Sequence, residues 1–262
     1  MQPNRIREKL NAGEPTLATH VHTTWPGMIE VIGLTGIYDY VEFVAEYAPF
    51  NMHDLENFCR AAELHNLSTM IKVDQAPRSF LAQRAIGAGF QSVLFADSRT
   101  VADAEECVRA VRADTPEARG IHGVAMRRAW YMSYGAGPDY PQALDDIVVA
   151  LMIERKSAVE QLDEFLEVKG VDMVQWGPAD YAMNIGRAGE FQHPDVKAAE
   201  KKVFETCLAK GIPPRAEINS VEQAQRFLDM GVTHFCIGTD INIIYDWLRD
   251  QGDTLRNLLS KA

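Results

Sequence analysis

The sequence contains little cysteine and has a deficit of positive charge. Its four cysteines, Cys59, Cys107, Cys207 and Cys236, lie far apart and form no C-x-x-C pair. We therefore expect reduced, packed thiols rather than disulfides or a cysteine-bound metal. The formal net charge of -11 at pH 7 argues against partners such as nucleic acid or an anionic membrane surface.

Long apolar runs are also missing from the sequence. No stretch approaches the roughly 18 residues needed to span a bilayer. The N-terminal residues MQPNRIREKLNAGEP are charged and lack the apolar core of a secretory signal. These features predict a cytoplasmic protein without membrane association. A chain of 262 residues fits one large α/β domain, which we assign to 1–262.

Short β-rich runs alternate with longer segments of helical periodicity. The runs predicted as strands are 17–22, 39–45, 69–73, 92–96, 148–154, 171–176, 213–218 and 234–238. Eight strands with intervening helices predict an α/β fold of the (β/α)8 TIM barrel type. The rival fold, a doubly wound sheet, requires a glycine-rich phosphate turn after the first strand. This chain has HTTWPGM there, so the barrel is favoured.

Two further segments lie outside this regular alternation. Residues 114–147 are rich in Arg, Tyr, Gly and Pro, which predicts an elaborated loop. Residues 243–262 predict an extra C-terminal helix with an apolar stripe. The stripe consists of Ile244, Trp247, Leu248, Leu255, Leu258 and Leu259. We expect this helix to pack on a neighbouring subunit; the alternative is that it covers its own barrel.

Polar side chains follow the predicted strands at their carboxyl ends, where barrel enzymes carry their chemistry. They are His22, Glu46, Tyr47, Lys72, Asp97, Glu154, Asp180, Glu217 and Asp240. Glu154 and Asp180 stand out because they follow two consecutive strands. Neighbouring strands lie about 4.8 Å apart, so these two carboxylates are able to converge on one divalent cation. Oxygen ligands of this kind favour Mg²⁺ or Mn²⁺ over Zn²⁺.

The spacing of these two acids also allows a structural interpretation. In that interpretation Glu154 is a rim acid that pairs with Arg155 or Lys156, and Asp180 caps a helix after the turn Gly177-Pro178. Sequence spacing alone does not distinguish the structural interpretation from the metal site.

Residues 151–196, LMIERKSAVEQLDEFLEVKGVDMVQWGPADYAMNIGRAGEFQHPDV, resemble the core of the HpcH/HpaI aldolase family. Its members are metal-dependent pyruvate aldolases of the 4-hydroxy-2-oxoheptanedioate aldolase type. Weaker similarity runs along nearly the whole chain, through MIEVIGLTGIYDYVEFVAEYAP, RGIHG and AQRFLDMGVTHFCIGTD. The resemblance implies a barrel of the phosphoenolpyruvate/pyruvate-binding type and a homo-oligomer, which is a hexamer in the family.

The resemblance also implies roles for individual residues. Glu154 and Asp180 correspond to the metal ligands, with Mg²⁺ or Mn²⁺ as the expected cation and Co²⁺ or Zn²⁺ as alternatives. The backbone N–H groups near Ala179 and Asp180 face the carboxylate of a 2-oxo acid in the family. Lys72 and Met152 occupy substrate-binding positions. In such a site the metal polarises the 2-oxo group and stabilises the enolate that carbon–carbon cleavage leaves.

The chain departs from the family pattern at the catalytic positions. Val44 and Tyr47 replace the Asp and His of the family's acid–base dyad, Lys72 replaces an Arg, and Met152 replaces a Gln. Lys72 keeps the positive charge but lacks the bidentate fork of a guanidinium. Tyr47 is able to donate a proton, but a reference pKa near 10 makes it a poor base at neutral pH.

Two histidines stand where the family has a Trp and a small residue. His20 and His22 are two residues apart on one strand, so they share a face. His22 is a candidate for the missing base, or for a third metal ligand. The alternative is that both are hydrogen-bonded barrel residues.

Other candidates are weaker. His122 adjoins the turn at Arg119-Gly120, and Arg127 and Arg128 either bind a second carboxylate or face solvent. The run WYMSYG forms an aromatic wall or a subunit contact.

The sequence thus predicts a metal-dependent carbon–carbon lyase that acts on a 2-oxo acid or a similar chelating substrate, with His22, Tyr47 and Lys72 as catalytic residues. One alternative is a decarboxylase, hydratase or tautomerase that uses the same site. Another is a non-catalytic protein that binds 2-oxo acids.

Overall fold

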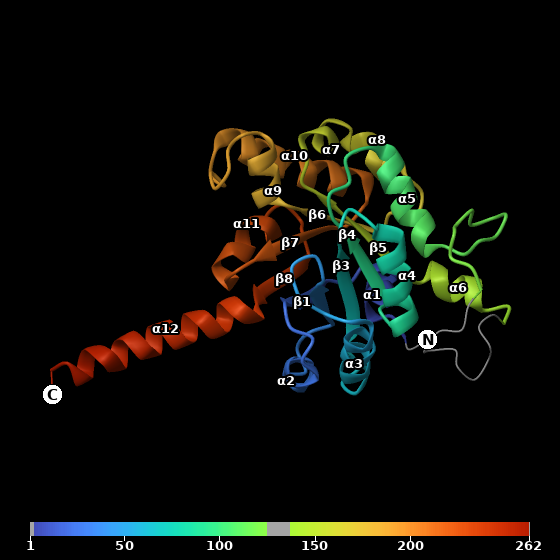
Figure 1. The fold of residues 1–262 in the computed structure, drawn as a ribbon. Coiled ribbons are helices and arrows are strands. Elements are labelled where there is room, and N and C mark those ends of the chain that lie inside the picture. Colours follow the sequence, from blue (N-terminus) through green and yellow to red (C-terminus); the bar gives the residue numbers. More distant parts are fainter. Residues whose placement is uncertain (1–2, 125–136, 262) are drawn as a thin grey trace.

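The computed structural model describes residues 3–124 and 137–261. These residues form a closed barrel of eight parallel strands that follow one another in chain order (Figure 1). The strands are β1 (Thr16–Val21), β2 (Tyr40–Val44), β3 (Ser68–Val73), β4 (Ser92–Phe95), β5 (Val148–Ile153), β6 (Met173–Trp176), β7 (Pro214–Ile218) and β8 (His234–Thr239). The predicted (β/α)8 barrel is confirmed, and each predicted strand is present with ends shifted by at most two residues.

Helices connect the strands, and most of them pack on the outside of the barrel (Figure 1). They are α1 (Arg5–Ala12), α2 (Pro26–Leu34), α3 (Met52–Glu63), α4 (Arg78–Ala88), α5 (Val101–Val111), α6 (Tyr140–Asp145), α7 (Lys156–Glu160), α8 (Leu162–Glu167), α9 (Pro178–Asn184), α10 (Pro194–Lys210), α11 (Ala224–Leu228) and α12 (Asp240–Leu259). Four of these twelve helices begin at a side-chain cap. Thr100, for example, forms a capping box with Asp103 at the start of α5.

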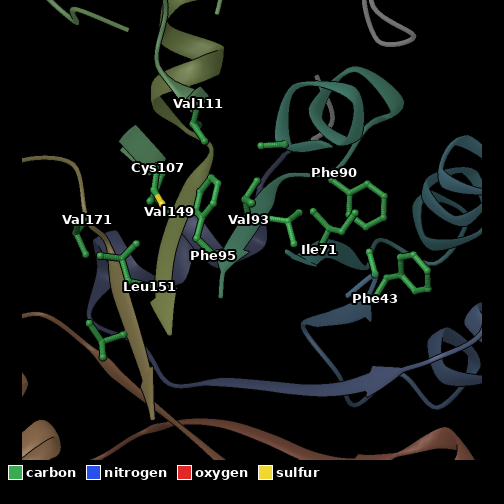
Figure 2. Close-up of a cluster of buried hydrophobic side chains, with 14 of the residues drawn as sticks. Phe43, Ile71, Phe90, Val93, Phe95, Cys107, Val111, Val149, Leu151 and Val171 are labelled. Carbon is green, nitrogen blue, oxygen red and sulfur yellow. The ribbon is translucent and has the colours of Figure 1, made fainter. Parts of the chain in front are cut away.

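The main hydrophobic core lies between the outer face of the barrel and the helices. Figure 2 shows part of it, where Phe43, Ile71, Val93 and Phe95 leave the strands toward the surrounding helices. Residues at the alternate strand positions form a second cluster inside the barrel. The two clusters follow from the strand period of two, which sends successive side chains to opposite faces.

The same period places charged groups inside the barrel at its carboxyl end. Tyr40, Met70 and Met152 belong to the inner cluster. The charged residues two positions further along the same strands are Glu42, Lys72 and Glu154. Each of these is at least 95% buried, so the inner cluster carries an ionisable layer on its carboxyl-end side.

The amino-terminal segment anchors to the other end of the barrel. Asn4 caps α1 and donates hydrogen bonds from Nδ2 to the carbonyl oxygens of Gln91 and Asp146, which precede β4 and β5. Ile6 is fully buried within the inner cluster. The open mouth of the barrel is therefore at the carboxyl ends of the strands.

Several predicted boundaries differ from the structure. β6 begins at Met173 rather than at 171; the side chain of Asp172, just before it, accepts hydrogen bonds from Arg7 and from the backbone N–H of Val149. The predicted loop 114–147 contains the helix α6. The predicted C-terminal helix begins at Asp240, directly after β8.

Among the residues that the structure describes, no helix combines the length and the apolar character required to cross a membrane.

α12 extends away from the barrel and ends far from it (Figure 1). Its 20 residues correspond to a length of roughly 30 Å. Residues 241–259 are exposed throughout, including the whole predicted apolar stripe. The alternative that this stripe covers its own barrel is therefore wrong.

We expect the protein to be a homo-oligomer, with the hexamer of the family as the first expectation, because an apolar stripe of this size is costly to leave in water. Light scattering at micromolar concentration should give a multiple of the 29.3 kDa chain mass. Leu248→Asp with Leu255→Asp should lower the mass, whereas Asp253→Asn on the same helix should not. A monomeric mass for the unmodified chain would contradict this expectation.

Candidate active site

Glu154 is held at the carboxyl end of β5 with only 2% of its surface exposed. Its Oε1 accepts a hydrogen bond of 2.6 Å from the backbone N–H of Asp97. Burial raises the pKa of Glu154 to about 7, against the opposing effects of Lys72 and that hydrogen bond, and the negative charges of Asp180 and Glu46 add to the rise. Glu154 is thus a desolvated carboxylate with acidic neighbours.

Gly177 provides the space that this carboxylate occupies. Met152 pairs with Gln175 and Ile153 with Trp176 across β5 and β6, so Gly177 follows beside Glu154. A Cβ on Gly177 would lie 2.6 Å from Cβ of Glu154 and 2.7 Å from its Oε2. Glycine is therefore required at 177 by the close approach of the acid.

Asp180 lies in the first turn of α9, three residues after Gly177. Its Oδ1 is 3.3 Å from Nη2 of Arg155, which also pairs with Asp97. No side chain caps α9, so the interpretation of Asp180 as a cap is wrong. The rim-acid interpretation of Glu154 is also wrong, because Glu154 is buried and Arg155 pairs with the two aspartates instead.

Ala179 is exposed in the same first turn, between Pro178 and Asp180. Helix geometry leaves the N–H groups of a first turn without acceptors inside the helix. Proline has no N–H, so the groups available to an acceptor at this end are those of Ala179 and Asp180.

Lys72 lies on β3 with its ammonium group facing Glu46 and Tyr47. Its Nζ is 2.6 Å from Oε2 of Glu46, donates to the Tyr47 hydroxyl at 3.2 Å, and sits 4.7 Å from the centre of the Tyr47 ring. Burial alone lowers the pKa of Lys72, but Glu46, Tyr47 and Glu154 outweigh it and raise the pKa well above its usual value. Lys72 is therefore a cation near the buried Glu154.

His20 and His22 both reach the mouth, as their shared strand face predicts. Their rings stack with centroids 6.0 Å apart, and the His22 ring lies 6.1 Å from that of Tyr47. His20 Nε2 hydrogen-bonds with the Thr239 hydroxyl. Burial and the neighbouring His20 lower the pKa of His22, so His22 is neutral at pH 7 and able to accept a proton.

A hollow of about 300 Å³ continues from Lys72 and Tyr47 across the mouth. Its lining comes from β1, β2, β3, β7, β8 and the start of α12. At its base the carboxylate of Glu42 pairs with Arg215, and both side chains are almost completely buried. The predicted residues His22, Tyr47 and Lys72 thus line one hollow.

Other predicted candidates do not join this group. Met152 belongs to the inner cluster, with its Cε directed at Gly177. His122 is buried near Tyr140, with their ring centroids 6.3 Å apart, in the segment outside the barrel after α5. Arg127, Arg128 and the run WYMSYG lie outside the described residues.

Three residues shape the site without having been assigned to it by sequence. Gly177 was predicted only as part of a turn, because its closeness to Glu154 depends on the pairing of β5 with β6. The sequence predicts Arg155 only as a partner for Glu154. In the structure its guanidinium group pairs with Asp180 instead. Glu46 was recognised as a strand-end acid, and only its contact with Lys72 gives it a place in the site.

Within residues 3–124 and 137–261, no three His, Cys, Asp or Glu side chains gather as a ready-made metal cluster. Among these residues His22 forms no such cluster with Glu154 and Asp180. Any cation held by these two carboxylates takes its other ligands from water and substrate oxygens, as Mg²⁺ commonly does.

A barrel with buried acids at its carboxyl-end mouth defines a class of α/β-barrel enzymes. Sequence comparison then identifies the family: residues 19–246 match the family described as HpcH/HpaI aldolase/citrate lyase, and the chain belongs to it.

Curated relatives and solved structures agree with this assignment. The chain is 28% identical over 257 residues to a 5-keto-4-deoxy-D-glucarate aldolase of Shigella boydii, covering 97% of each chain. It superposes on an HpcH/HpaI aldolase/citrate lyase family protein of Burkholderia cenocepacia with a TM-score of 0.87 and 26% identity, covering 97% of this chain and 100% of the other. The citrate synthase SbnG shares the fold, with a TM-score of 0.86 at 23% identity and coverage of 97% and 98%.

Gly177→Ala should displace the Glu154 carboxylate, because the new methyl group would meet its Cβ and Oε2 at under 3 Å. We expect a loss of at least ~10-fold in Mn²⁺ affinity, measured by calorimetry, since both acids must converge for tight binding. Gly252→Ala is the matched control, because a Cβ there has open space within 4 Å. Unchanged affinity in the Gly177 variant would show that the carboxylate does not need this space.

Proposed function

We propose that this protein is a divalent-metal-dependent carbon–carbon lyase that cleaves a 4-hydroxy-2-oxo acid into pyruvate and an aldehyde. The observation that carries the proposal is the placement of Glu154 at the end of β5 and of Asp180 in the first turn of α9, directly after β6, with Lys72 close to Glu154. Membership of an aldolase/citrate lyase family supports the same reaction class.

The residues present fit a hard divalent cation. Glu154 and Asp180 supply carboxylate oxygens, and the missing side chain at Gly177 leaves Oε2 of Glu154 unobstructed. Oxygen ligands of this kind suit Mg²⁺ or Mn²⁺. When bound, such a cation supplies Lewis-acid polarisation of the 2-oxo group.

Lys72 is positioned to stabilise negative charge on the substrate. Cleavage of the C3–C4 bond leaves its electron pair on the pyruvate fragment as an enolate, and a buried ammonium group favours that charge. Glu46 and Tyr47 keep the Lys72 side chain in one orientation through the contacts at 2.6 Å and 3.2 Å. The N–H groups of Ala179 and Asp180 are suited to receive the substrate carboxylate.

His22 is the group best suited to move the proton in this reaction. Cleavage requires a base that takes the proton of the 4-hydroxyl while the C3–C4 bond breaks. Burial raises the pKa of Tyr47 despite Lys72, so Tyr47 keeps its proton and serves to orient Lys72. The pKa of His22 is lowered instead, which leaves its ring neutral at pH 7.

Glu154→Ala and Asp180→Ala should each abolish Mn²⁺ binding and activity, because each removes one of the two anionic ligands. Calorimetry measures the binding, pyruvate release measures the activity, and circular dichroism checks the fold. Glu205→Ala, which removes an exposed acid on α10, is the control. Undiminished Mn²⁺ binding in both variants would refute the metal site.

His22→Asn should lower turnover by roughly 10²–10⁴-fold, the usual contribution of a general acid–base group. Metal affinity should change little, since His22 is not placed beside Glu154 and Asp180. If affinity falls together with rate, His22 is a ligand. If neither falls, His22 is a structural residue of the barrel.

The pH dependence follows from the direction of the His22 shift. A base acts in its neutral form, and the pKa of His22 is lowered from 6.5. Activity should therefore be full at neutral pH and fall as the pH drops below about 6.5. His22→Asn should remove this acidic limb from the pH–rate profile; a limb that persists would point to another base.

One observation favours a second candidate function at the same site. Val44 and Tyr47 stand at the two dyad positions, and Tyr47 is engaged with Lys72. A site without the usual dyad is still suited to decarboxylation of a 2-oxo acid that carries a second carboxylate on C3. Loss of CO₂ from C3 leaves its electron pair as the pyruvate enolate and needs no base for a hydroxyl proton. Release of CO₂ rather than an aldehyde, abolished by EDTA, would favour this candidate.

A further inference from the structure

We propose that the hollow beyond Lys72 is a subsite for an uncharged, hydroxyl-bearing substrate tail, and that it discriminates against a tail ending in a carboxylate. This inference rests on the proposed function, because it concerns the part of the substrate that departs as the aldehyde. The inference goes beyond the proposed function by assigning a chemical class to the aldehyde fragment.

The position of the hollow makes it the site of the tail. Glu154 and Asp180 come from β5 and the turn after β6, whereas the hollow is lined from β7 through β8 and β1 to β3. Lys72 lies at the junction: it lines the hollow and also influences Glu154. A 2-oxo acid bound at the two carboxylates therefore directs its C4 end past Lys72 into the hollow.

The hollow carries no spare positive charge for an anion. Of the described residues that line it, Lys72 is the one Lys or Arg side chain, and its ammonium group lies 2.6 Å from Glu46. Arg215, below the lining, is committed to Glu42. Burial and the neighbouring His20 lower the pKa of His22, so its ring is neutral at pH 7 and adds no positive charge to the hollow.

Glu217 gives the hollow a net negative charge. Its side chain is 38% exposed, in contrast to the buried Glu42. Its Oε2 accepts a hydrogen bond from Gln175 at 2.8 Å, and its Oε1 lies 3.9 Å from Nδ1 of His20. Neither neighbour is a lysine or arginine, so a carboxylate brought into the hollow would meet a like charge.

Hydroxyl groups match the lining where a carboxylate does not. The carboxylate of Glu217 accepts hydrogen bonds, the amide of Asn242 both donates and accepts, and the ring of His22 accepts at one nitrogen and donates at the other. A hydroxyl also does both, whereas an ionised carboxylate only accepts. The volume of about 300 Å³ corresponds to roughly ten waters at ~30 Å³ each, which is ample for a three-carbon tail.

The first measurement separates this inference from the proposed function. Exchange of the pyruvate methyl protons with D₂O, followed by NMR with Mn²⁺ or Mg²⁺ and no aldehyde, tests the pyruvate half of the site alone. Exchange that EDTA abolishes is expected. Its absence would overturn the proposed function, and the inference with it.

The second measurement tests the tail. Glyceraldehyde and tartronate semialdehyde are three-carbon aldehydes that differ in one end, a hydroxymethyl group in the first and a carboxylate in the second. We expect kcat/KM for addition of pyruvate to favour glyceraldehyde by ~10-fold or more. With exchange intact, equal values, a preference for the anionic aldehyde, or no turnover of glyceraldehyde would overturn the inference.

Substitutions at Glu217 then test the cause of the preference. Glu217→Gln should reduce the preference several-fold, and Glu217→Lys should reverse it by supplying a cation. Glu205→Lys, the same charge change on the outer face of α10, should leave the preference unchanged. Exchange of the pyruvate methyl protons checks that each variant is folded and binds pyruvate productively. If variants that pass this check keep the same aldehyde preference whatever the charge at position 217, the assignment of Glu217 is overturned.

Discussion

The close approach of the Gly177 backbone to the carboxylate of Glu154 is the constraint on which the candidate site depends. β5 and β6 are paired so that the acid at the end of one strand lies beside the residue that ends the other. Only a residue without a side chain leaves room for it. The chain then turns into α9, and Asp180 follows in the first turn. One backbone contact therefore sets the position of both acids.

The balance of charges around these acids determines the second property of the site, the raised pKa of Glu154. Glu46, Glu154 and Asp180 bring three carboxylates to one side of the mouth, while Lys72 and Arg155 bring two cations. Arg155 is shared with Asp97, and Lys72 is drawn mainly to Glu46. Glu154 is left with little compensation for its desolvation, which is why its pKa rises to about 7. A buried anion of this kind is well suited to a cationic ligand.

The sequence predicted the barrel because its strands are marked locally, as short apolar, β-rich runs that alternate with segments of helical periodicity. It also located Glu154 and Asp180 at the mouth, because the carboxyl ends of parallel strands meet at one rim; their role as metal ligands stays a prediction. What it could not predict depends on contacts between distant segments: the Glu154–Gly177 approach, the hold of Glu46 and Tyr47 on Lys72, and the role of Arg155. The break between α7 and α8 at Gln161 and the projection of α12 were also invisible, since an amphipathic pattern does not say which surface covers it.

The two acids and the hollow come from different arcs of the strand ring. The acids lie at the end of β5 and just after β6, whereas the hollow is lined by β7, β8, β1, β2 and β3. Lys72 on β3 lines the hollow and also acts on the pKa of Glu154. Hydrogen bonds between neighbouring strands close the ring, and the helices outside pack against it, so the barrel does not depend on the side chains that line its mouth. Substitutions in one arc are therefore possible without rebuilding the other. A scaffold partitioned in this way is modular, and its chemistry and its selectivity are able to diverge at separate rates.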